Sequence, residues 1–146
     1  MKKLFLVVAM TIFMVSATFA ADTYSRDEKI LPKAAVVTIA NNFKSKVSLI
    51  KVEKTIGITT EYDVILTDGT EIEFDRDGNW QSVEVSSSNA VPSGFILDGI
   101  SKYVSKNHPK TRIVGIERDG ANFDVTLSDG INLVFNTAGE FMKYED

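Results

Sequence analysis

The sequence predicts an α+β protein made of two tandem repeats, each with one helix packed on a four-stranded antiparallel sheet. Three observations support this prediction. A motif that runs from Tyr62 to Trp80 returns 61 positions later, from Phe123 to Phe141. Each copy begins with apolar residues at helical spacing and then changes to alternation with a period of two. Each copy also carries an Asp-Gly pair between two alternating segments, which is typical of a β-hairpin.

The first 20 residues predict a signal peptide. Lys2 and Lys3 form a short basic start, residues 4–19 are apolar and uncharged, and small residues around Ala20 suit cleavage after that position. The apolar run is too short to favour a permanent membrane span. We therefore expect a periplasmic or secreted protein with no membrane span after signal removal.

Charge and cysteine content exclude several classes of function. Without Lys2 and Lys3 the chain has 14 basic and 20 acidic residues, so a nucleic-acid partner is not expected. The chain has no cysteine, which excludes disulfides, thiolate metal sites and a cysteine nucleophile. The exported protein must be held together by its apolar core.

The repeats predict one domain over residues 30–146, with copies at 30–85 and 90–146 and a serine-rich linker between them. Each copy has only about 55 residues, and domains of that size are marginally stable alone. We expect the two copies to fold as one unit. Residues 21–29 are polar and are expected to fray.

A helix is predicted near the start of each copy, with Pro32 or Pro92 at its first position. The two apolar stripes are Val36, Ile39, Ala40 and Phe43 in the first copy, and Ile96, Ile100, Tyr103 and Val104 in the second. Gly94 and Gly99 weaken the second helix.

Four strands are predicted after each helix, the first near residues 48–53 or 112–117. The Asp-Gly pairs suit three-residue turns with glycine in the left-handed conformation. These turns predict the pairs Tyr62–Phe74, Val64–Ile72 and Leu66–Thr70, and in the second copy Phe123–Phe135, Val125–Leu133 and Leu127–Ile131. A second turn of the same kind places Trp80 beside Phe74 and Phe141 beside Phe135. All these side chains are expected to face the helices and form the core.

Alternation assigns the remaining strand residues to the opposite, open face. In the first copy they are Glu61, Asp63, Ile65, Glu71, Glu73, Asp75, Val83 and Val85, and in the second Asp124, Thr126, Asn132, Val134, Met142 and Tyr144. An exposed apolar patch framed by carboxylates is typical of a partner site. The predicted partner-binding residues are Ile65, Val83, Val134, Met142, Tyr144, Asp63 and Glu73.

A different interpretation of this face stays open. Asp63 lies opposite Glu73, and such like-charge pairs cost stability unless a cation compensates them. Lys51 on the first strand could neutralise the carboxylates. A β-bulge would turn Val83 and Tyr144 inward.

No catalytic residue, cofactor or metal site is predicted. Residues 75–79 lack the spacing of a calcium loop, because glycine stands at the fourth place and Ser86 at the twelfth. His108 is expected to be a solvated loop residue, and Trp80 a core residue. The alternative function is a carrier of a cation or small ligand, with the ligand held among four carboxylates: Glu61, Asp63, Glu73 and Asp75.

The chain resembles the PepSY-like, β-lactamase-inhibitor-like family in a signal peptide followed by two copies of the same pattern. Each copy has Leu/Val-Pro and a helix, then Tyr/Phe-Asp-Val-x-Leu-x-Asp-Gly, and later x-Gly-x-Trp/Phe. These are exported proteins common in gut Bacteroidetes. The resemblance covers residues 30–146 and implies helices packed on sheets. The sheets together would form a concave surface, which in β-lactamase inhibitory proteins binds the enzyme. It also implies protease inhibition as a related expectation. The leading hypothesis is a non-enzymatic, exported, inhibitor-like module that presents an open sheet to a protein or peptide of the cell envelope.

Overall fold

The computed structural model describes residues 22–145 and combines one β-sheet with two α-helices. The predicted signal peptide at residues 1–20 lies outside the described residues. The elements, in chain order, are β1 (Thr23–Ser25), α1 (Lys33–Asn42), β2 (Val47–Thr55), β3 (Ile58–Leu66), β4 (Glu71–Asp75), β5 (Trp80–Glu84), α2 (Asp98–Asn107), β6 (Ile113–Asp119), β7 (Asn122–Leu127), β8 (Asn132–Asn136) and β9 (Phe141–Glu145).

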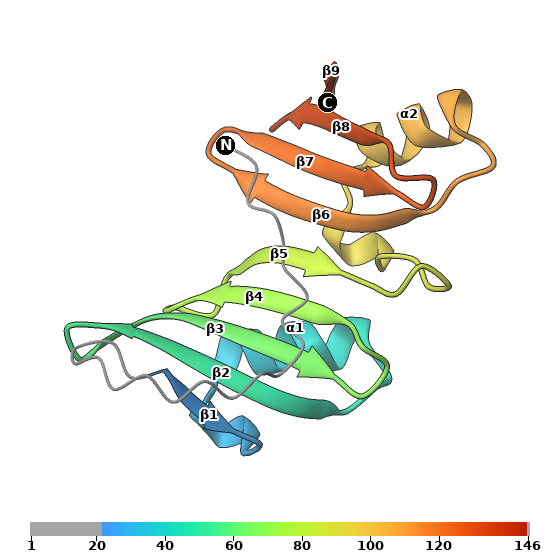
Figure 1. The fold of residues 1–146 in the computed structure, drawn as a ribbon. Helices are drawn as coiled ribbons and strands as arrows, with labels where there is room; N and C mark the ends of the chain where they lie inside the picture. The colour runs from blue at the N-terminus through green and yellow to red at the C-terminus, as the bar shows by residue number, and fades with distance from the viewer. Residues whose placement is uncertain (1–21, 146) are drawn as a thin grey trace.

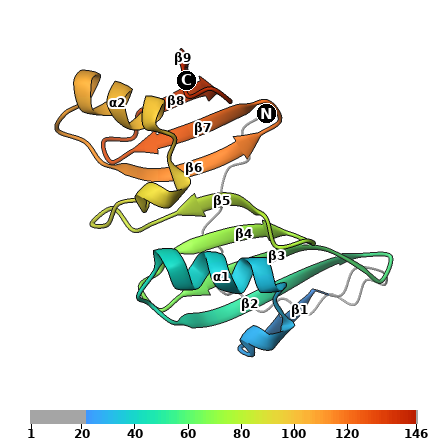
Figure 2. The same cartoon turned by 180° about the vertical axis from the view of Figure 1, so that it is seen from behind.

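The strands form a single nine-stranded antiparallel sheet in which each strand pairs with its neighbours in the chain (Figure 1). Both helices lie against the same face of this sheet, as the view from behind shows (Figure 2). The α+β class is therefore confirmed. The expectation of two separate sheets is wrong, because β5 pairs with β6 through Ser82 and Glu117.

The N-terminal segment forms structure that the sequence did not predict. Residues 23–25 pair with β2, so that Tyr24 lies opposite Lys51, and Glu28–Ile30 form a 3-10 turn capped by the side chain of Asp27. The expectation that residues 21–29 fray is wrong for these residues. A three-residue strand is too short for its periodicity to be recognised.

The first helix begins next to Pro32, close to its predicted start, whereas the second helix begins several residues after Pro92. Pro32 directly precedes α1, whereas Pro92 precedes a 3-10 turn over Ser93–Phe95 and α2 begins only at Asp98. The turn directs Phe95 into the core, where its ring lies 5.7 Å from that of Phe43. Sequence periodicity did not separate this turn from the helix because both place apolar residues at similar spacing.

Glycine allows α2 to approach the sheet closely. A Cβ atom added at Gly99 would lie 2.5 Å from the backbone oxygen of Gly139, in the turn between β8 and β9. Glycine at position 99 therefore has a packing reason that offsets its low helix propensity.

The three-residue turns and the pairs around them are as predicted. Tyr62 pairs with Phe74 and Phe123 with Phe135, and Gly69 and Gly130 have φ angles of 85° and 89°. The core between helices and sheet includes Phe74 and Phe135, both fully buried. In the part of the chain that the structure describes, neither helix is long and apolar enough to span a membrane.

Candidate functional site

The sheet face away from the helices, here called the open face, carries side chains in rows that cross the strands. In the central row each residue pairs with the next across neighbouring strands from β2 to β9. The row consists of Lys51, Asp63, Glu73, Ser82, Glu117, Asp124, Val134 and Lys143. Directly opposed residues lie close enough to interact. Lysine therefore stands near each end of a row whose middle is acidic.

The rows on either side of the central row add further carboxylates. One is Leu49, Ile65, Glu71, Glu84, Gly115, Thr126, Asn132 and Glu145. On the other side Glu53 pairs with Glu61, and Glu61 with Asp75. Acidic residues therefore face acidic residues at four cross-strand pairs between β2 and β5, namely Glu53–Glu61, Glu61–Asp75, Asp63–Glu73 and Glu71–Glu84. This confirms the like-charge pairs expected from the turns.

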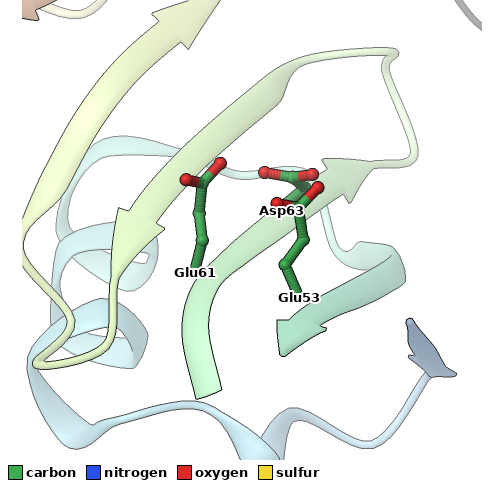
Figure 3. A group of neighbouring side chains, drawn as sticks. All are labelled: Glu53, Glu61 and Asp63. Carbon is green, nitrogen blue, oxygen red and sulfur yellow. The ribbon is translucent and has the colours of Figure 1, made fainter. Parts of the chain in front are cut away.

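Three carboxylates converge at the β2–β3 pair (Figure 3). Glu53 extends from β2, and Glu61 and Asp63 extend from β3, with one ligand oxygen of each within 4.8 Å of the others. Alternation along β3 places Glu61 and Asp63 on the same face, and antiparallel pairing brings Glu53 beside them. We call Glu53, Glu61 and Asp63 the carboxylate trio.

Lys51 is the cation that compensates this cluster. Its Nζ atom lies 3.5 Å from a carboxylate oxygen of Asp22 and 3.8 Å from one of Asp63, and it donates a hydrogen bond to Glu53. Burial alone would lower the pKa of Lys51, but the hydrogen bond and the surrounding carboxylates raise it above its usual value. Lys51 therefore contacts the carboxylates as predicted, through Glu53 and Asp63.

The cluster holds more negative charge than one lysine balances. Burial, followed by hydrogen bonding and repulsion from Glu73, raises the pKa of Glu61 to about 7. Burial and the charges of Glu61 and Glu53 raise the pKa of Asp63 to about 7 as well. A carboxylate held at such a pKa gains from a nearby cation, because the cation stabilises its charged form.

Two other acidic residues of the open face also have raised pKa values. Burial and the neighbouring charge of Glu71 raise the pKa of Glu84. In the second half of the sheet, burial and the charge of Glu145 raise the pKa of Asp124. The open face therefore favours groups that bring positive charge.

The predicted partner-binding residues do not form one apolar patch. Ile65 lies on the open face, half-buried beside Leu49 and Glu71, and Asp63 and Glu73 lie on it as predicted. Val134 also lies on this face but is only 3% exposed, and it lies outside the main core cluster. Met142 is 54% exposed and occupies a bulge in β9.

Two predicted residues face the helices instead of the open face. A β-bulge between β4 and β5 brings Val83 opposite Ile72, where Val83 is 1% exposed and belongs to the core. The equivalent bulge between β8 and β9 brings Tyr144 opposite Leu133. The placement of Val83 and Tyr144 on the open face was therefore wrong, because each bulge inserts one residue and reverses the alternation after it.

The edge strand β9 and α2 share an aromatic cluster around Tyr144. The Tyr144 hydroxyl lies 3.3 Å from His108 Nε2 and 3.5 Å from the Tyr103 hydroxyl. The Tyr103 ring stacks on that of Phe141 with a centroid distance of 4.4 Å. His108 follows the end of α2, as predicted for a loop residue, but its side chain is half-buried in this cluster instead of fully solvated.

Other residues considered for chemistry have structural roles. Asp75 accepts hydrogen bonds from the backbone N–H groups of Asp77 and Asn79, which confirms a hairpin turn at residues 75–79. Trp80 packs edge-on against Phe95 in the core, and the Arg118 guanidinium lies 4.0 Å from the Trp80 ring centroid. The predicted core role of Trp80 is confirmed.

Sequence reasoning missed Glu53 as a member of the cluster. The signal was available, because β2 alternates between buried residues at 50 and 52 and half-exposed residues at 51 and 53. The β2–β3 register decides which carboxylate of β3 lies beside Glu53, and that register contains a shift between Glu53 and Lys54. Alternation alone does not locate such a shift.

A protein-family model described as "Putative beta-lactamase-inhibitor-like, PepSY-like" matches residues 60–143. Among solved structures, a "putative periplasmic protein of unknown function" from Bacteroides vulgatus has a TM-score of 0.80 and 39% identity, covering 86% of this chain and 100% of its own. A "putative calcium-regulated periplasmic protein" from Bacteroides thetaiotaomicron has a TM-score of 0.76 and 31% identity, covering 87% of this chain and 97% of its own. No curated protein matches.

These similarities confirm two predictions. The predicted family resemblance is confirmed by the family model and the solved relatives. The predicted periplasmic or secreted location agrees with relatives that are described as periplasmic proteins.

Proposed function

The chain belongs to the PepSY-like, β-lactamase-inhibitor-like family, and we propose that it is a non-enzymatic periplasmic binding module whose open face binds a positively charged segment of another envelope protein or peptide. The observation that carries this proposal is the row-by-row acidity of the sheet between β2 and β5. The family resemblance supplies the expectation of an inhibitor-like module, and the chemistry of the face supplies the kind of partner.

Charge, rather than apolar area, supports the choice of partner. Val83 and Tyr144 face the helices and Val134 is nearly inaccessible, so the apolar patch predicted from the sequence is greatly reduced. The carboxylates remain on the open face, and burial raises the pKa of Glu61 and of Glu84. A partner that brings lysine or arginine side chains relieves this repulsion and gains complementary electrostatic steering.

The proposal is tested by removing charge from the open face and, in a matched control, from elsewhere. The open-face variant is Glu61→Gln/Glu71→Gln/Glu84→Gln, and the control variant Glu28→Gln/Asp98→Asn/Asp129→Asn removes equal charge outside the face. Each is used for affinity purification from the native envelope, with bound proteins identified by mass spectrometry. We expect the wild type and the control to retain a common partner that salt releases and that the open-face variant loses. Equal capture by all three proteins would refute the proposal.

A second candidate function is calcium binding at the carboxylate trio. Calcium prefers six to eight oxygen ligands at about 2.3–2.6 Å, and three carboxylate oxygens within 4.8 Å of one another fit around one such ion. The B. thetaiotaomicron relative described as calcium-regulated favours this candidate over other cations. Protein ligands from the trio alone would leave the remaining positions to water.

Calcium and Lys51 would compete for the same carboxylates, because Lys51 Nζ already contacts Glu53 and Asp63. We therefore expect weak affinity, with dissociation constants of about 10⁻⁴–10⁻³ M, as in extracellular calcium modules. Titration calorimetry should show heat with calcium, stronger binding for Lys51→Met and none for Glu61→Gln/Asp63→Asn. A flat calcium titration of both the wild type and Lys51→Met would eliminate this candidate.

A further inference from the structure

The sheet ends in two edge strands, β1 and β9, and β9 offers the longer edge. β1 has three residues, whereas β9 has five and pairs only with β8 among the described strands (Figure 1). Met142 and Tyr144 of β9 are 54% and 53% exposed, and Lys143 between them is exposed as well. An edge strand of this kind carries backbone N–H and C=O groups that a further strand can pair with.

Hydrogen bonds in two hairpin turns show which way the backbone of β8 points. In the turn between β7 and β8, the Leu127 N–H donates to the Ile131 oxygen, and in the turn between β8 and β9, the Asn136 N–H donates to the Glu140 oxygen. The backbone groups of successive residues in a strand point to opposite sides. Odd-numbered residues of β8 therefore direct their backbone groups toward β7, and even-numbered residues direct theirs toward β9.

The same alternation identifies the unpaired backbone groups of β9. Lys143 and Glu145 lie opposite Val134 and Asn132, the even-numbered residues of β8. The backbone groups of Lys143 and Glu145 therefore point toward β8. The N–H and C=O of Tyr144, which lies between them, point away from the sheet.

The side chains of β9 are arranged so that the strand is complementary to itself. Lys143 and Glu145 lie on the open face, where Lys143 is exposed and Glu145 is half-buried. In an antiparallel pair of β9 strands related by a two-fold axis at Tyr144, Lys143 of each copy lies opposite Glu145 of the other. The two Tyr144 residues then form a hydrogen-bonded pair, and each Lys143–Glu145 pair is of the closer, non-hydrogen-bonded kind, with Cα atoms about 4.5 Å apart.

The charges of β9 select this register over the neighbouring one. An axis at Lys143 would place the two lysines directly opposite each other, and like charges in that position cost stability. A single lysine on an edge strand usually opposes pairing with another strand. In β9, Glu145 supplies the opposite charge two residues later on the same face, so a second copy of this strand matches both charges.

We propose that two copies of the protein pair through β9, with the two-fold axis at Tyr144 and Lys143 of each copy opposite Glu145 of the other. The contact uses the same surface of both copies, so assembly stops at the dimer. Because each copy contributes only one short strand, the dimer is weak. The two sheets become continuous and the two open faces lie on the same side. This proposal does not depend on the proposed binding of a basic partner.

Sedimentation velocity on protein purified from the periplasm tests the proposal, with concentration raised to about 1 mM. The single variants are Lys143→Glu and Glu145→Lys, and Lys102→Glu at an exposed position of α2 is the matched charge control. We expect the wild type and the control to approach the sedimentation coefficient of a dimer and nothing larger. Each single variant should stay monomeric, because like charges then oppose each other at both pairs.

Charge exchange makes the test decisive. The double variant Lys143→Glu/Glu145→Lys should dimerise again, and an equimolar mixture of the two single variants should form heterodimers, because both arrangements restore two opposite-charge pairs. Hydrogen exchange of the Tyr144 amide should slow as the wild-type concentration rises. Circular dichroism and melting temperature verify that the variants fold. A monomeric wild type, a Glu145→Lys variant that dimerises like the wild type, or a mixture that stays monomeric would each overturn the proposal.

Discussion

The two halves of the sheet use the same turns and the same core pairs but differ in the charge of their open faces. Residues 61 positions apart show the difference: Glu61 corresponds to Asn122, Glu71 to Asn132 and Glu73 to Val134, whereas Asp63 and Asp124 are both acidic. Cross-strand pairing at these positions is equivalent in the two halves. The carboxylates of the first half are therefore not needed to form this architecture.

The comparison separates residues that build the fold from residues available for function. Phe74 and Phe135 are alike because both halves need a large side chain beneath a helix. Open-face side chains meet no such demand and are free to vary. A like-charge cluster that costs stability and that the fold does not require supports the proposed binding role.

The largest effect is expected when the equivalent core residues are truncated. Phe74→Ala and Phe135→Ala should each lower the free energy of unfolding by about 3–5 kcal/mol, because both side chains are fully buried. Since β5 pairs with β6, both variants should show a single transition in urea, by Trp80 fluorescence and by circular dichroism. Two separate transitions would show that the halves fold independently.

A smaller difference in the free energy of unfolding is expected between alanine variants of two turns within the first half. Gly69 and Gly78 have φ angles of 85° and 87°, so alanine is strained at both. An added Cβ at Gly69 meets nothing within 4 Å, whereas at Gly78 it would lie 2.8 Å from Pro32 Cβ. Gly78→Ala should therefore destabilise the protein by about 1–3 kcal/mol more than Gly69→Ala in urea unfolding. Equal losses would mean that the contact with Pro32 relaxes freely.

The dependence of stability on pH should come from the acidic half. The pKa values of Glu61 and Asp63 are raised to about 7 in the folded protein. The folded state therefore holds these protons more tightly than the unfolded state, and stability should fall as pH rises from about 4 through 7. Both groups are partly exposed, so we expect a total change of about 1–2 kcal/mol.

Urea unfolding between pH 4.5 and 8 measures this change, with Glu61→Gln/Asp63→Asn as the comparison. The double variant should show a flatter profile and should be the more stable protein at pH 8. Asp124→Asn in the second half should alter the profile less, because it removes one carboxyl group with a raised pKa instead of two, and the charge of Lys143 offsets part of the repulsion on it. A double variant that keeps the wild-type profile would contradict the raised pKa values.

The smallest effect on stability is expected at the tips of two hairpins, at Ile56 between β2 and β3 and at Ala121 between β6 and β7. Ile56→Asn should raise the free energy of unfolding by up to about 1 kcal/mol, because asparagine tolerates the left-handed conformation that isoleucine resists. Ala121→Ser at the other tip should leave stability within about 0.5 kcal/mol. Thermal unfolding is the measurement. A destabilised Ile56→Asn variant would show that Ile56 contributes to the fold.

Most of the strand pairing around the turns could be predicted from the sequence. Glycine at the third turn position requires a positive φ, and this requirement sets the register that joins Tyr62 to Phe74 and Phe123 to Phe135. The acidity of the open face followed from the same register, since Asp63 and Glu73 must then oppose each other. These features depend on residues close together in the chain, so local conformational rules determine them.

Tertiary structure alone decided where alternation breaks and which distant strands meet. The bulges that turn Val83 and Tyr144 toward the helices depend on packing against the core, and no residue type marks them. The joining of β5 to β6 and the addition of β1 depend on strand edges that only the assembled sheet presents. The carboxylate trio needed Glu53 from a separate strand, and contacts between strands are set by the whole sheet rather than by sequence spacing.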